Sequence, residues 1–254
     1  MRLSNKVAII TGAISGIGYS AAKLFAAEGA KLVLSARRES LLENLCEEIE
    51  RAGGRAVFVA GDIQDEDHVA SLVETAEQEY GCLDIAFNNA GIIGAGKNIE
   101  ALTLSEWQHT ISTNLTSGFL SGKYQIPAMK RNGGGSIIYT SSFVGETAAI
   151  ANHSDYAVTK SGLIALAKSL AVETGEFNIR VNALLPGGTD TPMNFANAPD
   201  AAPEMLDYLN GIHALKRMAD PDEIARAALF LASDDASFVT GSALLADGGV
   251  SLTK

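Results

Sequence analysis

Short apolar runs alternate with longer helical stretches along this chain, and this alternation limits the folds that are open to it. The expected strands lie at residues 6–10, 31–35, 55–60, 83–87, 136–140, 179–184 and 243–246. The expected helices lie at 17–28, 40–52, 66–80, 105–131, 155–173 and 221–232, and residues 186–220 are expected to be irregular. Short apolar strands between helices form a parallel sheet that is covered on both faces. Right-handed crossovers then predict a doubly wound α/β fold of about seven strands, with a ligand crevice at their carboxyl ends.

The composition fits one domain and excludes several kinds of partner. The 254 residues are 47% hydrophobic, which is enough for one large core, so we expect a single domain over residues 1–254. The formal net charge of −11 would repel nucleic acid and anionic membrane, and we expect neither as a partner. Cys46 and Cys82 are too few for a disulfide framework, and no His/Cys cluster predicts a metal site. The first ten residues resemble neither a signal peptide nor a membrane span, which favours the cytoplasm.

Three glycines stand between the first expected strand and the first expected helix. Residues 11–18 read Thr-Gly-Ala-Ile-Ser-Gly-Ile-Gly, which places glycines at Gly12, Gly16 and Gly18. Glycines at such a turn let the backbone approach a ligand closely, so that a pyrophosphate can bind at the helix N-terminus. A plain strand-to-helix turn could use the same residues, but this position in the chain favours a dinucleotide site.

A phenol and an amine lie one helical turn apart at Tyr156 and Lys160. Side chains at (i, i+4) on a helix point the same way. The ammonium group would lower the pKa of the phenol from about 10 toward neutrality by favouring the phenolate. Such a tyrosine could donate and accept protons at physiological pH. The alternative is an ordinary amphipathic helix with an exposed lysine and a half-buried tyrosine.

Taken together, these motifs resemble the short-chain dehydrogenase/reductase family over nearly the whole chain. The matching segments are the turn at 11–18, Asp62, Asn88-Asn89-Ala90-Gly91, Tyr156 with Lys160, Pro186-Gly187 with Thr191, and Asp247-Gly248-Gly249. The resemblance implies a Rossmann-like, dinucleotide-binding and catalytic domain in which residues 187–220 form the substrate loop. The cofactor contacts that it implies are Gly12, Ser15, Gly16, Ile17, Gly18, Asp62, Ile63, Asn89, Ala90, Gly91, Tyr156, Lys160, Pro186, Gly187, Thr189 and Thr191.

The catalytic serine departs from the family pattern. The family places it thirteen residues before the tyrosine, where this chain has Phe143, which lacks a hydroxyl. Ser142 lies fourteen before Tyr156, and a one-residue insertion in the loop 145–155 would restore the match, because loops absorb insertions easily. We therefore expect Ser142 to be the catalytic serine, with Ser141 as the alternative. Both could instead merely cap the end of a strand.

The resemblance implies a catalytic set of Asn114, Ser142, Tyr156 and Lys160. Reduction of a carbonyl group develops negative charge on oxygen, which must be stabilised and then protonated. Ser142 would donate a hydrogen bond to that oxygen and Tyr156 would deliver the proton. Lys160 would lower the pKa of the phenol and bind the nicotinamide ribose. Asn114 would position a water behind Lys160, although an asparagine that bonds to backbone inside a long helix is an equally good interpretation.

The end of the second expected strand bears on the choice of cofactor. An NAD-selective site has a carboxylate there for the adenosine 2′-hydroxyl, whereas this chain has Ala36 followed by Arg37 and Arg38. Arginine binds a 2′-phosphate through charge-assisted hydrogen bonds, so we expect NADP(H) to be favoured over NAD(H). Against this, Ser15 stands where many NADP-preferring relatives have a basic residue, and the arginines could be solvated loop residues.

A ketone or keto ester, with the corresponding secondary alcohol, is the expected substrate pair. The loops 145–155 and 192–220 should line an apolar pocket, unless their side chains pack on the core or on another subunit. The apolar residues in question are Ile150, Met193, Phe195, Met205, Leu206, Tyr208 and Leu209.

The resemblance also implies a homotetramer, with a subunit contact on the helix that carries Tyr156. The small residues of that contact are Ala157, Ser161, Ala165 and Ala171. Two other functions stay open. An NADP(H)-binding redox-sensing or scaffold protein without turnover is disfavoured by the retained Tyr156 and Lys160. An epimerase or dehydratase acting on nucleotide sugars is disfavoured by the chain length and the glycine spacing.

Overall fold

Seven parallel strands form one sheet in the computed structural model, which describes residues 1–194, 197 and 202–253. The strands are β1 (Val7–Thr11), β2 (Lys31–Ala36), β3 (Arg55–Ala60), β4 (Ile85–Asn88), β5 (Gly135–Thr140), β6 (Ile179–Pro186) and β7 (Ala243–Ala246). Their order is β3-β2-β1-β4-β5-β6-β7, so the chain reverses its direction of travel across the sheet between β1 and β4. Ligands of doubly wound sheets bind at such a reversal, beyond the carboxyl ends of the strands. The predicted fold class is confirmed.

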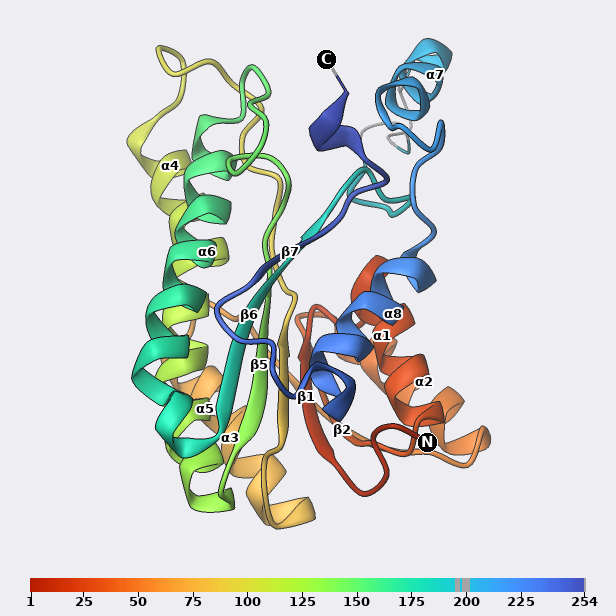
Figure 1. Ribbon diagram of the computed structural model, residues 1–254, viewed down its shortest axis with the longest axis vertical. Coiled ribbons are helices and arrows are strands. Elements are labelled where there is room, and N and C mark those ends of the chain that lie inside the picture. Colours follow the sequence, from red (N-terminus) through yellow and green to blue (C-terminus); the bar gives the residue numbers. More distant parts are fainter. Residues whose placement is uncertain (195–196, 198–201, 254) are drawn as a thin grey trace.

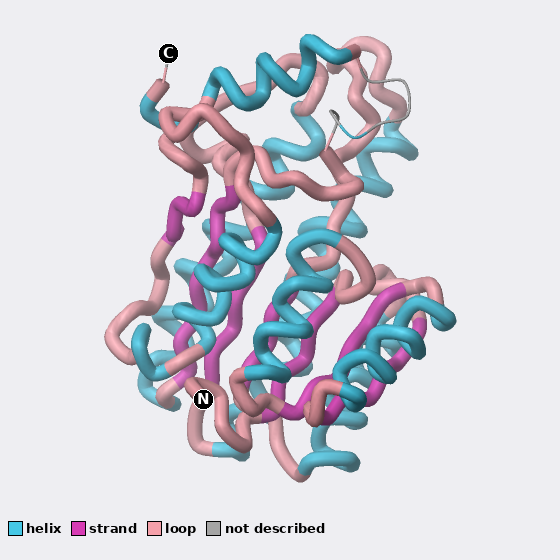
Figure 2. The backbone as a smooth tube through the Cα atoms, turned by 90° about the vertical axis from the view of Figure 1, so that its right-hand side faces the viewer, coloured by secondary structure: helices cyan, strands magenta, loops and turns pink. Residues whose placement is uncertain are grey.

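Helices cover both faces of this sheet (Figure 1). On one face lie α1 (Gly16–Ala27), α2 (Glu39–Arg51) and α8 (Pro221–Ala232). On the other lie α3 (Glu66–Tyr80), α4 (Leu104–Ile111), α5 (Ser117–Asn132) and α6 (Ser154–Thr174). Figure 2, turned by 90°, shows the strands between helices in front and behind, with the C-terminus beyond their upper ends.

Each strand contributes side chains to two apolar cores. In β1, Ala8 and Ile10 pack with the core beneath α1, whereas Val7 and Ile9 pack with the core on the opposite face. Successive side chains of a strand point to opposite faces, so a strand covered on both sides must be apolar at every position. This is why residues 7–10 appear in the sequence as an unbroken apolar run.

Two expectations about helices are wrong. The single helix expected at 105–131 is divided into α4 and α5 by a π-helical turn, Ser112–Thr116, which contains Asn114. Such turns are rare and occur frequently at functional sites. The segment expected to be irregular contains a further helix, α7 (Pro203–Ile212), whose first helical position is a proline. Proline favours that position because its missing N–H has no partner in the first turn.

One residue of the expected subunit contact is buried within the chain itself. Ala171 is 7% exposed and belongs to the core that contains Leu163 and Ala167. It lies on the face of α6 that packs on the sheet, so it is not available to a partner subunit. No helix in the described ranges is long and apolar enough to cross a membrane.

Candidate active site

The turn after β1 leaves the N-terminus of α1 open to a ligand. Gly16 has a φ of 51°, in the left-handed region that favours glycine. A Cβ on Gly18 would lie 2.2 Å from the carbonyl oxygen of Gly12, so any side chain there would displace the turn. Ser15 precedes the helix with extended backbone, and no side chain in the described part of the chain caps α1 or adds negative charge to its first turn. Free N–H groups at a helix N-terminus bind phosphate.

Two cavities meet at this turn. The large cavity, of about 1110 Å³, lies beyond the carboxyl ends of β1, β4, β5 and β6. The small cavity, of about 300 Å³, extends over the end of β2. Gly12, Ser15, Ala90 and Gly91 line both, so the two spaces adjoin at the turn. Their arrangement fits an elongated cofactor whose middle section binds at the start of α1.

The expected cofactor residues fall into two groups around these cavities. In addition to the four shared residues, the large cavity is lined by Gly16, Ile17, Asn89, Tyr156, Lys160, Pro186, Gly187, Thr189 and Thr191. The small cavity is lined by Arg37, Arg38, Asp62 and Ile63. Gly18 lines neither of them, because it packs beneath the turn against Gly12 and Asn89.

Asn89 connects the segment after β4 to the glycine turn. Its side-chain amide donates to the carbonyl oxygens of Thr11, at 3.2 Å, and Gly12, at 3.4 Å. The backbone N–H groups of Asn89 and Ala90 both donate to Thr11 Oγ1, each at 3.0 Å. The Asn-Asn-Ala-Gly segment therefore stabilises the shape of the glycine turn, in addition to lining the large cavity.

Arg37 and Arg38 are exposed at the small cavity, directly after β2. Within the part of the chain that the structure describes, neither guanidinium makes an ion pair. Asp62 is occupied locally, because its Oδ1 accepts from the backbone N–H of Gln64 at 3.0 Å. The arginine charges are thus available to an anionic group in this cavity.

Lys160 is buried on α6, with 4% of its surface exposed. Its Nζ donates to the carbonyl oxygen of Thr140 at 2.7 Å and lies 5.5 Å from the centre of the Tyr156 ring. Burial penalises the charged amine and lowers the pKa of Lys160 to about 8. The pair is therefore brought to one place, as the sequence predicts.

The structure does not show the expected lowering of the Tyr156 pKa by Lys160. Burial raises the pKa of the Tyr156 phenol, and the group that lowers this pKa is the hydrogen-bonded hydroxyl of Ser142. The reason is that the Lys160 ammonium group is directed to the Thr140 carbonyl and not to the phenol oxygen. A pair at (i, i+4) shares a helix face, but its polar ends need not meet.

The two serines at the end of β5 have different partners. Ser141 Oγ donates to the backbone carbonyl of Lys160 at 2.7 Å, which connects β5 to α6. Ser142 Oγ accepts from the backbone N–H of Val144 at 3.1 Å and lies beside Tyr156. Phe143, at the family position of the serine, packs in an apolar cluster with Val144 and Val250. The geometry favours Ser142 as the serine that faces a substrate oxygen.

Asn114 is buried in the π-helical turn and lines neither the large nor the small cavity. Its Oδ1 accepts from the N–H of Ile92 at 2.8 Å. Its Nδ2 donates to the carbonyl of Ile92 at 2.9 Å and to Thr159 Oγ1 at 3.1 Å. Asn114 therefore bonds to the backbone after β4 and to α6, and its role in positioning a water stays a prediction.

The substrate end of the large cavity is apolar, as expected. Ile150, Met193, Met205, Tyr208 and Leu209 line it. Leu206 is not among the described lining residues and is 46% exposed, while Phe195 lies outside the described residues.

Further lining residues were missed from the sequence. They are Ile93 from the segment after β4, Ile212 from the end of α7, and Val250 and Thr253 from the segment after β7. Val250 and Thr253 could have been predicted, because they follow β7 and the carboxyl ends of all strands of a parallel sheet lie at the same edge.

Comparisons with known proteins point to one family. The family model described as enoyl-(acyl carrier protein) reductase matches residues 12–251. The chain is 38% identical over 247 residues to cyclohexanol dehydrogenase of Acinetobacter sp. (strain SE19), covering 97% of this chain and 95% of that one. It is 40% identical over 248 residues to a 2,5-dichloro-2,5-cyclohexadiene-1,4-diol dehydrogenase of Sphingobium indicum, covering 97% of each.

A solved structure of a reductase has the same fold. The crystal structure of levodione reductase superposes with a TM-score of 0.94 at 34% identity, covering 98% of this chain and 99% of that one. With a matching family model, relatives near 40% identity and the same fold, the chain belongs to the short-chain dehydrogenase/reductase family.

Proposed function

We propose that the protein is an NADP(H)-dependent oxidoreductase that interconverts a secondary alcohol and the corresponding ketone. The observation that carries this proposal is the convergence of Ser142, Tyr156 and Lys160 on a cavity that adjoins the small cavity at the glycine turn of α1. The bound cofactor would supply the hydride. The residues of the chain supply orientation, a hydrogen bond to the substrate oxygen and a proton.

Each catalytic residue has a defined role in this proposal. Tyr156 Oη gives its proton to the substrate oxygen during reduction and takes it back during oxidation. Ser142 Oγ donates a hydrogen bond to the same oxygen, where negative charge develops. Lys160 binds the ribose hydroxyls of the cofactor and supplies positive charge near the phenol. Asn114 bonds the π-helical turn to the segment after β4 and to α6. The proposal also includes a water that Asn114 positions behind Lys160.

The preference for NADP(H) rests on the small cavity. Ala36 leaves no carboxylate at the end of β2, and the guanidinium groups of Arg37 and Arg38 line the space where an adenosine 2′-phosphate would lie. Arginine binds phosphate through two parallel charge-assisted hydrogen bonds. The same groups would gain nothing from the uncharged 2′-hydroxyl of NAD(H).

Replacing Arg37 with aspartate is expected to raise the KM for NADPH by about tenfold to a hundredfold, because a charge-assisted bond is lost and a repulsion is added. The KM for NADH should change less than about threefold. Arg55→Asp is a matched control, since Arg55 is exposed at the opposite end of the sheet, where β3 begins. Steady-state kinetics with both cofactors measures this, and an equal rise in both KM values would remove the argument for NADP(H).

A cyclic alcohol or ketone is the substrate class that we propose. Ile150, Met193, Met205 and Leu209 line the same cavity as Tyr156. Relatives are named for cyclohexanol, for a cyclohexadiene diol and for levodione. The test is a spectrophotometric screen in which purified protein is given cyclohexanol, linear secondary alcohols and the matching ketones, with each cofactor. Turnover of at least one cyclic pair is expected. NADPH binding without turnover of any substrate would favour the redox-sensing or scaffold alternative.

We also propose a homotetramer with a subunit contact over α5 and α6. Ala157, Ser161 and Ala165 of α6 are at least partly exposed. The same two helices also expose two large apolar side chains. Phe119 on α5 is 54% exposed and Val158 on α6 is 47% exposed. Exposed apolar side chains on one face support an interface there.

A further inference from the structure

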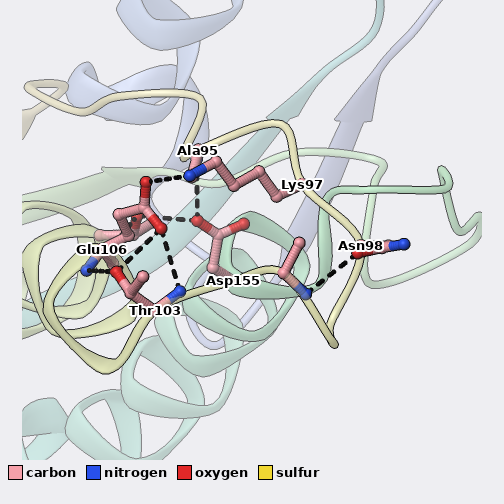
Figure 3. Close-up of polar contacts among 8 residues, drawn as sticks. Ala95, Lys97, Asn98, Thr103, Glu106 and Asp155 are labelled. Atoms are coloured by element: carbon pink, nitrogen blue, oxygen red, sulfur yellow. Dashed lines mark hydrogen bonds and ion pairs between the residues drawn. The ribbon is translucent and has the colours of Figure 1, made fainter.

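Asp155 is a buried carboxylate immediately before Tyr156, with only 1% of its surface exposed. Three donors converge on it. Its Oδ1 accepts from the backbone N–H of Tyr156 at 2.9 Å, and its Oδ2 accepts from the N–H of Ala95 at 3.0 Å and from Thr110 Oγ1 at 2.9 Å. The bonds to Ala95 and Thr110 join segments that lie far apart in the sequence, and Figure 3 shows Ala95 beside the Asp155 carboxylate.

The three partners belong to three different elements around the active site. Tyr156 lies in the first turn of α6, Thr110 lies in α4, and Ala95 lies in the segment 91–97 after β4, which we call the β4 loop. The loop passes so close to the carboxylate that a Cβ on Gly94, whose φ is 87°, would lie 2.5 Å from Asp155 Oδ2. Only glycine therefore fits at position 94 without displacing Asp155.

The β4 loop is connected to its neighbours on both sides of Ile93, which lines the large cavity. Before Ile93, the Asn114 side chain bonds to both backbone groups of Ile92 and to Thr159 of α6. After Ile93, Asp155 bonds to Ala95. Farther along, Lys97 Nζ lies 2.6 Å from Glu106, whose carboxylate also belongs to the capping box of α4 (Figure 3). Asp155 is the contact that joins this loop directly to the turn that carries Tyr156.

We propose that Asp155 is a positioning residue that fixes the Tyr156 turn of α6 against the β4 loop and α4. It acts through Tyr156 and Ile93 and lines neither cavity, so it needs no contact with substrate or cofactor. The inference rests on the proposed function, in which a displaced Tyr156 slows proton transfer.

A carboxylate is required at this position because every group that faces it is a donor. In Asp155→Asn, the amide oxygen can replace only one of the two carboxylate oxygens. The NH₂ group, which cannot accept, then faces the N–H of either Tyr156 or Ala95. Thr110 Oγ1 has a second acceptor, the carbonyl of Glu106 at 3.1 Å, and can turn away. The N–H groups of Ala95 and Tyr156 have no such freedom.

The first experiment compares Asp155→Asn with Asp222→Asn. Asp222 occupies the same position in the first turn of α8, is exposed, and has no side-chain hydrogen bond in the described part of the chain, so it controls for the loss of charge at a helix N-terminus. We expect Asp155→Asn to lower kcat by roughly tenfold to a hundredfold, since a displacement of about 1 Å in an active site costs about this much. The KM for NADPH should stay within about twofold, because the glycine turn and Arg37 are distant from this contact.

A second measurement does not depend on turnover. In the cofactor-free protein, hydrogen exchange at the amides of Ala95 and Tyr156 is expected to accelerate in Asp155→Asn and not in Asp222→Asn. Thr110→Val is the milder variant in case Asp155→Asn does not fold, and we expect it to lower kcat by about twofold to fivefold with the charge retained.

Two results would overturn the proposal. The first is that either Asp155→Asn or Thr110→Val has the same kcat as the control variant Asp222→Asn. The other is a fall in activity that follows only the folded fraction, with unchanged exchange at Ala95 and Tyr156. Failure of the proposed function is distinguishable, because then the unaltered protein turns over no substrate while the exchange measurement still reports on Asp155.

Discussion

Replacing Tyr156 with phenylalanine is expected to lower kcat by about a thousandfold while the affinity for NADPH changes by less than about twofold. The phenol supplies the only proton that the proposed mechanism uses, and general acid catalysis contributes about a hundredfold to ten-thousandfold. The ring itself packs against the cluster of Phe143, Val144 and Val250, so phenylalanine preserves the packing. Steady-state kinetics gives kcat, and quenching or titration of bound NADPH gives the affinity.

The matched control for this variant is Tyr208→Phe. Tyr208 also lines the large cavity, from α7, and is 64% exposed. It should lose less than about threefold in kcat. If Tyr156→Phe and Tyr208→Phe behave alike, the proton does not come from Tyr156 and the assignment of the site is wrong.

Replacing Lys160 with methionine is expected to abolish turnover and, at the same time, to stabilise the protein at pH 7. Turnover is lost because the positive charge beside the phenol and the cofactor ribose disappears. Stability rises because the amine is buried, and a pKa lowered from 10.5 to about 8 corresponds to a penalty of about 3 kcal/mol for the charged form. Loss of the bond to Thr140 costs about 1 kcal/mol. We therefore expect a net gain of about 1–2 kcal/mol in the free energy of unfolding.

The pH dependence of that gain has a definite sign. Between about pH 8 and 10.5 the folded protein has lost the Lys160 proton while the unfolded chain keeps it. The unfolded state then binds more protons, so the stability of the unaltered protein rises with pH across this window. The difference between Lys160→Met and the unaltered protein should shrink in the same window. Urea unfolding at pH 7, 8, 9 and 10 measures it, and a variant less stable than the parent at pH 7 would contradict the burial argument.

The fold could be predicted because its causes are local. From Val7 to Ile10, β1 is apolar on both faces, so the strand is visible as an apolar run. The glycine turn follows directly from its spacing, since the backbone of Gly16 and the close approach at Gly18 exclude side chains. The convergence of these segments then follows from the rule that parallel strands end at one edge.

The parts that could not be predicted depend on contacts between distant segments. The π-helical turn at Asn114 is stabilised by bonds to Ile92 and Thr159, which a helical pattern in the sequence does not contain. The direction of the Lys160 ammonium group depends on the Thr140 carbonyl at the end of β5. Asp155 reads in the sequence as a polar residue at a helix start, and only the fold brings Ala95 and Thr110 to it.

Transfer of deuterium from labelled NADPH tests the central proposal most directly. Samples of NADPH deuterated on each face of C4 are incubated with protein and cyclohexanone, and the alcohol is examined by mass spectrometry. With the unaltered protein, the account predicts that deuterium from one of the two samples appears on the carbinol carbon. With Tyr156→Phe, it predicts that NADPH still binds but that this transfer is no longer detected. Binding of NADPH by the unaltered protein without transfer of label to any ketone tried would contradict it.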